Sequence, residues 1–504
     1  MAALVHIILL AAHLSALQAR TVGRPVAPPK PTLAAASRAL PVRIDGSWYD
    51  LGQWAEAHPG GAWLLHYHRG RDVTALFHSI HLRSSSRAAA ILGKMTRLEP
   101  EEVEGARPFT FERSAALSGT PAPIVGEGAR VFVLARSAFA LELQQLVDEE
   151  FPTPQSTKAD ALHWLRIWAA LGLCVASWTG WTFGDVPSIA ALPLCAWALA
   201  SQTTHEATHS LLSTKPWVNY ICQFTAHPLF FNVFCWIPEH LTSHHQYTND
   251  AAYDVDVHLF APVRINAGAD ALPHAAPFLG TRGYTQFLVK GALSTLGTSV
   301  LQPMRALLEL QTPNFGANIT PVPSDVTKEM LALSMAPALM ALLWPFLALA
   351  LGLVPAPVAL LQLVWPWVGA SIIWTTMTQV SHIQAETQTD QPAIPSAADA
   401  PTCWWARQAE TSLDYSAGLP LVTALSAGLN TQSLHHTLPM VCSCHYPRIY
   451  ARYAQICARH GVRLQSVPDL GAAIGGLVSF IRQMNPPEPA PKGLLGVSVS
   501  GRLE

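Results

Sequence analysis

Three short clusters hold the histidines most able to do chemistry in this chain of 504 residues. They read His205-Glu-Ala-Thr-His209, His240-Leu-Thr-Ser-His244-His245 and Gln432-Ser-Leu-His435-His436. Imidazole is a good ligand for iron, and histidines beside a membrane are costly unless they bind something. The alternative, that they only form hydrogen bonds at helix ends, requires three independent accidents. We therefore predict a metal centre.

The spacing within each cluster indicates how the ligands divide between metal ions. Residues four apart share one face of an α-helix, so His205 and His209 can bind one metal, as can His240 and His244. Adjacent helical residues diverge by about 100 degrees, so each doublet, at 244–245 and 435–436, can serve two metals. Seven imidazoles and the Gln432 carbonyl are too many for one ion, so we predict two.

The composition indicates a membrane protein. Half of the residues are hydrophobic and only 13% are charged, against a usual charged share of about 25%. The net charge of −2 gives no electrostatic case for binding nucleic acid. None of the eight cysteines forms a CxxC pair, and the Cys442-Ser-Cys444 segment is a weak metal or redox signal that we interpret as structural.

Four apolar stretches are long enough to place the clusters beside a bilayer. Each approaches the roughly 20 residues that a membrane span needs, and they cover 161–181, 186–203, 329–353 and 356–378. A fifth apolar stretch, 217–236, lies between two clusters that must share one side of the membrane. We predict that it is interfacial or re-entrant.

Charge in the connecting segments predicts the orientation of these spans. The short turns near Gly184 and over 354–357 contain no lysine or arginine. The segments on the other side carry basic residues, namely Lys158, Lys215, Lys328 and Arg407. By the positive-inside rule, all three clusters face the cytosol.

An N-terminal module is predicted over residues 41–98. Alternation over 42–44 followed by Asp45-Gly46 is typical of a strand and a turn. His58-Pro59-Gly60-Gly61, then Gly70-Arg-Asp-Val-Thr-Ala-Leu-Phe77 and His81, resemble the cytochrome b5 domain. The resemblance implies a haem b site at His58-Pro59-Gly60-Gly61, with His58 and His81 as axial ligands. Two axial imidazoles leave no open position, so such a haem transfers electrons. His78 is the rival second ligand, and we expect His66 and His68 on the surface.

Taken together, the chain resembles a front-end fatty acyl desaturase with an N-terminal cytochrome b5 domain, a member of the membrane histidine-box desaturases. The resemblance covers residues 41–470 and includes Tyr247-Thr-Asn-Asp250, Gln379-Val-Ser-His382, Trp405 through Thr411, and Asn430 through Pro447. In this family each of the three histidine clusters is called a histidine box. Gln432, in place of the first histidine of the third box, resembles the front-end subgroup. The expected fold is mostly α and integral to the membrane, with four spans, boxes on the cytosolic side and a small α+β haem domain.

The resemblance implies a di-iron centre that uses dioxygen and two electrons to desaturate a polyunsaturated acyl chain. The seven box histidines would bind iron, with Gln432 and His382 completing the ligand shells. Six acids near the boxes could orient ligand imidazoles through their second nitrogen: Glu206, Asp250, Asp254, Asp256, Glu410 and Asp414. Glu206, Ser433-Leu434 and the segment at Thr437 depart from the usual boxes and leave the substrate open.

The expected organisation is a signal or transit leader over 1–40, the haem domain over 41–98, and a linker with a membrane-lying amphipathic helix over 99–157. The desaturase domain follows over 158–484, and a disordered tail over 485–504. The amphipathic pattern itself covers 131–147.

The implied partners are a polyunsaturated acyl lipid or acyl-CoA, O2, and cytochrome b5 reductase with NADH or a plastid electron donor. The expected location is the endoplasmic reticulum membrane, or a plastid membrane reached through the leader. The Tyr-Thr-Asn and His-Tyr-Pro segments favour the delta-5 or delta-4 type. Three alternatives stay open: an acyl hydroxylase or acetylenase on the same scaffold, a zinc-dependent membrane amidohydrolase, and a membrane-anchored haem electron carrier with inactive boxes.

Overall fold

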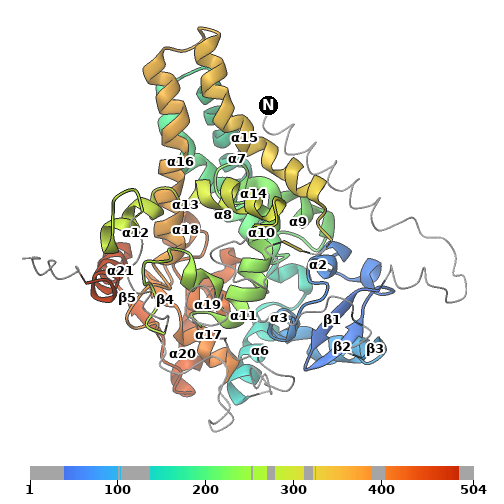
Figure 1. Ribbon diagram of the computed structural model, residues 1–504. Coiled ribbons are helices and arrows are strands. Elements are labelled where there is room, and N and C mark those ends of the chain that lie inside the picture. Colours follow the sequence, from blue (N-terminus) through green and yellow to red (C-terminus); the bar gives the residue numbers. More distant parts are fainter. Residues whose placement is uncertain are drawn as a thin grey trace, which may run out of the picture.

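Long helices gather at one end of the molecule and the N-terminal strands lie at the other (Figure 1). The structure is a computed structural model that describes residues 39–99, 103, 137–250, 254–268, 278–310, 322–323, 325–388 and 403–486. The expected leader therefore lies outside the described residues except for 39 and 40. The expected disordered tail lies outside them except for 485 and 486.

Four helices of the described chain are long and apolar enough to cross a membrane, and they confirm the predicted mostly helical, four-span architecture. They are α7 (Ala161–Thr182), α8 (Val186–Thr208), α15 (Lys328–Ala350) and α16 (Ala356–Gln379). Helix α8 continues five residues beyond its predicted end at 203, so the first histidine box begins inside it. Its polar residues do not end the helix, because Gln202 and Thr203 donate hydrogen bonds to carbonyls one turn back.

The outer faces of these helices carry large apolar side chains that no other part of the described chain covers. Leu165 is 64% exposed, Trp168 63%, Phe346 58% and Leu360 62%. An apolar surface of this kind on a helix bundle marks contact with lipid. These exposed apolar side chains agree with helices that cross a bilayer, in which the backbone hydrogen bonds are satisfied within each helix.

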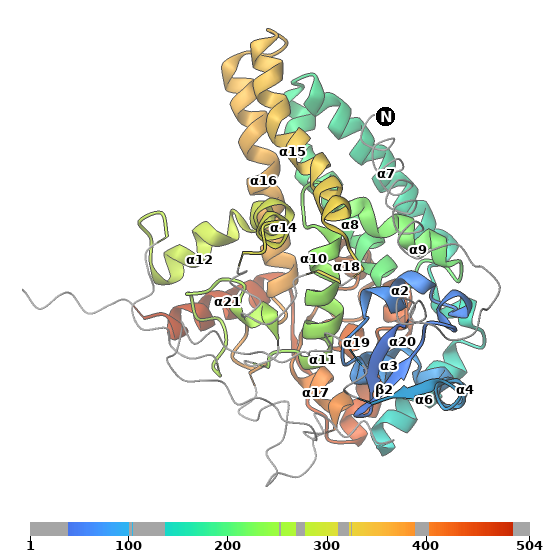
Figure 2. The same cartoon turned by 45° about the vertical axis from the view of Figure 1, so that its right-hand side comes forward.

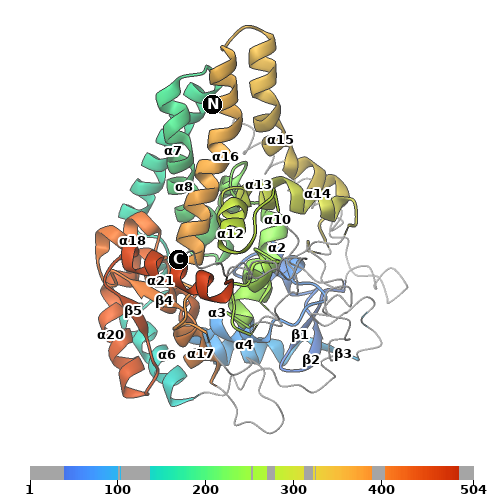
Figure 3. The same ribbon diagram turned by 60° about the vertical axis from the view of Figure 1, so that its left-hand side comes forward.

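The two helical hairpins meet at the end of the molecule that is distant from the histidines (Figure 3). Gly184, in the turn between α7 and α8, has a φ of +79°, and a Cβ there would lie 2.5 Å from Val354 Cγ1. Trp344 Nε1 also donates to the Thr182 carbonyl over 3.0 Å. Because only glycine tolerates both the backbone angle and the close approach, this turn locks the hairpins together.

The N-terminal module is a small antiparallel sheet packed on short helices. Its strands, in the spatial order β1-β2-β3, are β1 (Pro41–Ile44), β2 (Ser47–Asp50) and β3 (Thr96–Leu98). The predicted turn between the first two strands is present, with positive φ at Asp45 and Gly46. The helices are η2 (Ala55–Ala57), α2 (Ala62–Tyr67), α3 (Thr74–Ile80), η3 (Leu82–Ser84) and α4 (Ser85–Leu92).

This module packs directly on the helical domain (Figure 2). Trp63 and Tyr67 of α2 join a buried cluster with Tyr220 of α9 (Pro216–Cys222) and Phe234 of α10 (Val233–Ile237). A buried aromatic interface of this kind holds the two domains in one orientation.

The surface positions expected for His66 and His68 are wrong, since both side chains are buried. His66 Nδ1 lies 2.7 Å from Asp325 Oδ2, and His68 Nδ1 lies 3.2 Å from Thr242 Oγ1. These histidines lie at the interface between the two domains. The sequence of the N-terminal module alone does not show that this interface exists.

The amphipathic helix expected on the membrane is α6 (Ala138–Glu150), and its apolar face is covered by protein instead. Leu143 and Val147 are fully buried in a cluster with α17 (Trp404–Glu410) and α20 (Tyr446–Arg459). Figure 1 places α6 at the end of the molecule away from the spans. An amphipathic pattern shows that a face is buried, but it does not show what covers that face. Residues 131–136 of the predicted pattern lie outside the described residues.

The remaining elements connect the spans and enclose the histidines. The apolar stretch 217–236 is divided among three short helices and the non-helical residues 227–232, and none of these helices is long enough to cross a membrane. This division agrees with the prediction of an interfacial or re-entrant segment. Strands β4 and β5 pair in parallel. The elements are η5 (Pro154–Thr157), η6 (Gln223–Ala226), η7 (Pro238–His244, a π-helix), α11 (His245–Tyr247), η8 (Val255–His258), α12 (Gly283–Gly291), α13 (Ser294–Leu296), η9 (Gly297–Leu301, a π-helix), α14 (Gln302–Leu307), β4 (Leu413–Tyr415), α18 (Pro420–Ser426), α19 (Gln432–Thr437), η10 (Ser443–His445), β5 (Gln465–Val467) and α21 (Leu470–Met484).

Candidate metal centre

The structure brings all nine predicted iron ligands together, at the end of the spans that is nearest the N-terminal module. They come from α8 and the residue that follows it, from η7 and α11, from the segment after α16, and from α19. They are His205, His209, His240, His244, His245, His382, Gln432, His435 and His436. Eight of these side chains are buried, and His205 is half-buried.

Five imidazoles form a first group, in which one nitrogen of each lies within 4.8 Å of the others. The group comprises His205, His209, His240, His245 and His435. Neighbouring Nε2 atoms are 3.0 Å apart for His209 and His240, 3.2 Å for His240 and His245, and 3.1 Å for His245 and His435. Nitrogens that share one metal at about 2.0–2.1 Å lie at about these separations from one another. Iron suits an imidazole donor set of this kind.

A second group combines His244, His382 and His436, again with nitrogens within 4.8 Å of one another. Gln432 borders this group, since its Nε2 lies 3.1 Å from His382 Nε2 and 3.3 Å from His436 Nε2. Gln432 Oε1 is buried without a hydrogen-bond partner among the described residues. Turning the amide over exchanges its oxygen and nitrogen, which gives the group a carbonyl ligand and removes the buried orphan.

The prediction that His240 and His244 share one metal is wrong for a reason of backbone geometry. These residues lie on η7, a π-helix, in which hydrogen bonds run from residue i to i+5. Residues five apart therefore share a face, and His240 joins His245 while His244 turns to the second group. The doublets divide between the groups as the sequence predicts, with His435 in the first and His436 in the second.

Two predicted acids lie against one ligand imidazole, that of His244. Asp254 Oδ2 accepts a hydrogen bond from His244 Nδ1 over 3.0 Å, which leaves His244 Nε2 for the metal. Asp256 lies 3.5 Å from the same nitrogen. Burial lowers the pKa of His244, but the two carboxylates outweigh it and raise that pKa to about 9. This basicity is what a carboxylate gives to a metal-bound imidazole.

The other predicted acids have different tasks in the described structure. Glu206 accepts a hydrogen bond from the Ser443 backbone, Asp414 from Ser433, and Glu410 from the Arg463 backbone. Asp250 lies 4.0 Å from Arg407. These carboxylates therefore connect neighbouring segments of the desaturase domain through hydrogen bonds or an ion pair.

Sequence reasoning missed three polar residues that hold imidazoles. His435 Nδ1 lies 3.3 Å from the Tyr446 hydroxyl. His436 Nδ1 lies 3.2 Å from Gln408 Oε1 and 3.1 Å from Thr248 Oγ1. All three lie in segments that resemble the family outside the boxes, which was the available signal. None of the three is an acid, the residue type expected to orient a ligand imidazole.

Replacing Asp254 by asparagine is expected to lower iron affinity or activity by about 10- to 100-fold, because the second nitrogen of His244 loses its hydrogen-bonded carboxylate. Titration of iron into the metal-free protein would measure the affinity. Glu410→Gln is the matched control, because Glu410 holds a backbone amide and no imidazole. Equal affinities for both variants would show that Asp254 does not tune the centre.

Four ligand imidazoles, in contrast to His244, are held in the neutral form that metal binding requires. Burial, followed by the neighbouring imidazoles, keeps the pKa values of His240, His245 and His436 well below the usual range. Burial likewise lowers the pKa of His382 to about 3. A neutral imidazole already has a free lone pair, so little free energy is needed to deprotonate these ligands before a metal binds.

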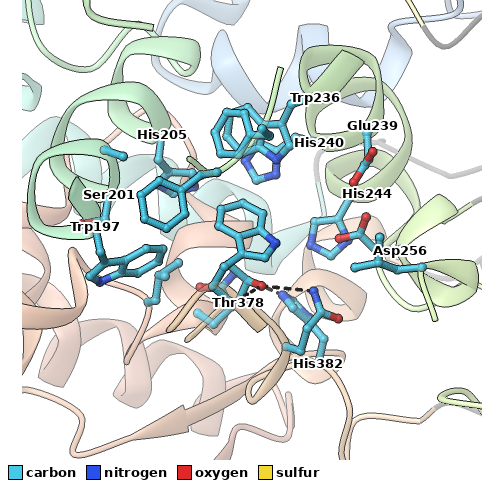
Figure 4. A pocket seen from close by; sticks show the side chains of 18 residues that line it. Trp197, Ser201, His205, Trp236, Glu239, His240, His244, Asp256, Thr378 and His382 are labelled. Carbon is cyan, nitrogen blue, oxygen red and sulfur yellow. Dashed lines mark hydrogen bonds and ion pairs between the residues drawn. The ribbon is translucent and has the colours of Figure 1, made fainter. Parts of the chain in front are cut away.

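A narrow cavity of about 60 Å³ opens onto both groups. The rings of His205, His240, His244 and His382 point toward it, and tryptophan side chains form much of its wall (Figure 4). Trp236 stacks on His240, with ring centroids 4.2 Å apart. Aromatic side chains and candidate metal ligands therefore share one cavity.

The N-terminal module holds a second pair of facing imidazoles. His58 and His81 have ring centroids 6.3 Å apart. His58 Nδ1 lies 3.3 Å from the Gly61 carbonyl, and His81 Nδ1 lies 2.8 Å from the Phe77 carbonyl. Each Nε2 is thereby left for a metal. The spacing suits one iron with two metal–nitrogen bonds of about 2 Å each. Burial, with His81 as second cause, lowers the pKa of His58 to about 4.

The remaining predicted haem residues lie around this pair. His78 instead contacts the Asp45 carboxylate over 3.0 Å and is partly exposed. Gly61 has a φ of +100°, and a Cβ there would lie 2.8 Å from Pro216 and from Trp63. Gly61 therefore lets the Pro59-Gly60-Gly61 segment pass beside α9 while His58 faces His81.

Comparisons with known proteins agree with this arrangement. The profile of the family described as "Fatty acid desaturase" matches residues 176–468, and that of the "Cytochrome b5-like Heme/Steroid binding domain" matches residues 37–99. The chain is 28% identical over 463 residues to an acyl-lipid omega-13 desaturase of Chlamydomonas reinhardtii, covering 85% of this chain and 90% of the relative.

Two further relatives extend the comparison. An acyl-lipid (7-3)-desaturase, chloroplastic, of Chlamydomonas reinhardtii is 27% identical over 87% of this chain and 79% of its own length. Delta(5) fatty acid desaturase A of Dictyostelium discoideum is 23% identical over 90% of this chain and 92% of its own length. With the family profile matching more than half of its length, this chain belongs to the fatty acid desaturase family and carries a cytochrome b5-like domain ahead of the desaturase domain.

Proposed function

We propose that this protein is a front-end acyl-lipid desaturase of the delta-5 or delta-4 type, served by two iron ions and a fused haem. The observation that carries the proposal is the pair of histidine groups that border one cavity whose wall also contains tryptophan and phenylalanine side chains. Several relatives are named acyl-lipid desaturases, and one is named a Delta(5) desaturase. These names support a lipid-bound chain as the substrate.

In this proposal each histidine group holds one iron. The first iron takes the five imidazoles of the first group. The second takes His244, His382 and His436, with Gln432 as a carbonyl ligand. Bound iron supplies, from O2 and two electrons, the oxidising power to remove hydrogen from an unactivated methylene, which side-chain acids and bases cannot do.

The chain's own residues position the substrate and protect the reaction. Trp236 and Trp197 wall the cavity, so an acyl chain lies against aromatic faces with its methylenes near both groups. The partners on the second nitrogens, Asp254, Gln408 and Tyr446, fix the ring orientations. Fixed rings hold the reacting position constant relative to the bound chain.

Electrons would come from a haem b between His58 and His81. The module that carries this pair touches the second box directly. Gln246 Nε2 donates to the Asp72 carbonyl over 3.1 Å, and Thr242 contacts His68. A contact this close gives a short route from the haem to the irons without diffusion of a carrier. A cytochrome b5 reductase with NADH, or a plastid donor, would reload the haem.

Breaking the domain interface at Asp325 is expected to slow electron delivery by about three- to tenfold. Asp325 accepts from His66 and lies 3.4 Å from Arg69, so Asp325→Ala removes charge-assisted contacts of about 1.5–3 kcal/mol each. Stopped-flow reoxidation of the reduced haem under O2 would measure the effect. Glu309→Ala is the matched control, because it removes an exposed ion pair with Lys328 near the same helix. An unchanged reoxidation rate in Asp325→Ala would contradict the role of the interface.

The chain is a multi-pass membrane protein, and we propose the endoplasmic reticulum as its location, with a plastid membrane as the alternative. Fluorescent fusion of the full chain in algal or plant cells distinguishes the two. A plastid signal that disappears when residues 1–40 are deleted would favour the transit leader.

The test of the activity is a fatty-acid profile of yeast that expresses the full chain and is fed C18, C20 and C22 polyunsaturated acids separately. We expect a product two mass units lighter than one fed acid, with its new double bond at delta-5 or delta-4. Expression of His435→Ala gives the background. A product sixteen units heavier would mean hydroxylation, and a new bond on the methyl side of the existing ones would contradict front-end chemistry.

A further inference from the structure

The Cys442-Ser443-Cys444 segment, which links α19 to α20, places two thiols side by side behind the third box. Their sulfur atoms lie 3.4 Å apart and share a hydrogen bond. Cys442 is fully buried, whereas Cys444 is half-buried and borders a second cavity of about 200 Å³. Residues at the start of α7, in α18 and at the start of α20 line this cavity.

The two thiols are chemically unequal. The hydrogen bond with Cys442 and the contact with His445 outweigh burial and lower the pKa of Cys444 to about 5. Burial raises the pKa of Cys442 well above its usual value. Arg166 and Arg448 also line the cavity beside Cys444. A partly accessible thiolate next to a protonated thiol is the arrangement of an oxidation-sensitive dithiol.

A metal site is the rival reading of this cluster, since His163 lies near both sulfurs. However, both imidazole nitrogens of His163 are already engaged: Nε2 lies 3.2 Å from the Gln202 carbonyl, and Nδ1 lies 3.0 Å from the Arg166 guanidinium. A guanidinium at this distance also repels a cation. The geometry therefore favours thiol chemistry.

We propose that Cys442 and Cys444 are a modification site, which hydrogen peroxide converts reversibly to a disulfide. The Cys444 thiolate attacks peroxide, giving a sulfenic acid and hydroxide. The Cys442 thiol then attacks that sulfur, forming the S–S bond and releasing water. The two thiols lose two electrons in total, and peroxide is reduced to two waters once the released proton and hydroxide combine. Disulfides on a cytosolic face are typically transient ones of this kind.

Closing this ring reaches the iron centre through two contacts. The sulfurs must approach from 3.4 Å to about 2.05 Å, which moves the intervening Ser443. The Ser443 amide donates to Glu206, beside His205 of the first box, over 3.2 Å. Tyr446, two residues beyond Cys444, contacts His435 of the third box. The disulfide therefore loosens two boxes at once, and the oxidised protein loses activity until it is reduced.

The test uses the full-length protein in lipid nanodiscs, treated with hydrogen peroxide, alkylated and examined by mass spectrometry. We expect the peptide with both cysteines to lose two mass units and to resist alkylation until a reductant is added. Cys442→Ser should stop at a sulfenic acid that dimedone traps. Cys457→Ser, which removes a buried thiol of α20, is the matched control and should respond like the parent protein.

Activity gives an independent measure. Peroxide should inactivate the parent protein, reductant should restore it, and Cys444→Ser should resist inactivation at the same peroxide dose. Two cysteines that stay fully alkylatable in active protein after peroxide would overturn the proposal. Zinc bound by the parent and lost from Cys444→Ser would also overturn it, in favour of a metal site.

Discussion

Replacing His245 by alanine is expected to abolish desaturation and to remove one of two iron ions per chain. His245 Nε2 lies 3.2 Å from His240 Nε2 and 3.1 Å from His435 Nε2, at the centre of the first group. Loss of this nitrogen opens the ligand shell of the first group, so the iron held there should be lost. Iron analysis of the purified protein and the fatty-acid profile together measure the result.

The control for His245→Ala removes an equally buried imidazole that belongs to neither group. His227 is such a residue, and its Nε2 lies 3.4 Å from a backbone amide. His227→Ala should keep both irons, whatever stability it loses. Two irons in His245→Ala with full activity would show that this histidine is not a ligand.

The second large effect is expected at the haem. His81→Ala should eliminate haem binding and reduce turnover with NADH and reductase to background, because His81 supplies one of the two imidazoles that face each other. The visible spectrum of the purified protein measures haem directly. Iron in the desaturase domain should be unaffected, which separates electron supply from the oxidation chemistry.

The neighbouring His78 provides the matched variant. It lies on α3, which ends one residue before His81, but its imidazole contacts Asp45 at the surface of the module. His78→Ala should retain the full haem spectrum and turnover. If His78→Ala lost the haem and His81→Ala kept it, the ligand assignment would be reversed.

Much of the fold follows from local sequence. Spans are long apolar runs, and their ends in the structure differ from the predictions by a few residues. The largest difference is at the end of α8. Gln202 and Thr203 are polar residues at its predicted end, but their side chains donate hydrogen bonds to carbonyls of the same helix, and the helix continues. The turn at Asp45-Gly46 was likewise predictable, because its positive φ angles favour these residue types.

The sequence predicts which histidines form the candidate site, but it does not predict how they separate into two groups. The box histidines can be identified from their residue type and spacing, and in the structure they all lie together. Their sharing between two groups depends on a π-helix, which the spacing of His240 and His244 does not reveal. The partners of His435 and His436 are a tyrosine, an amide and a hydroxyl from distant segments. Such tertiary contacts have no local signature.

The burial of Trp63 and Tyr67 against the helical domain has a kinetic consequence. A haem domain that is part of the same chain as its acceptor and already packed against it would transfer each electron in a first-order step. The rate of that step would not change when the membrane is diluted with lipid. A separate haem protein could compete only near the effective concentration of the tether, on the order of millimolar. Turnover should therefore depend on how fast the reductase meets this one chain, and not on how much free carrier the membrane holds.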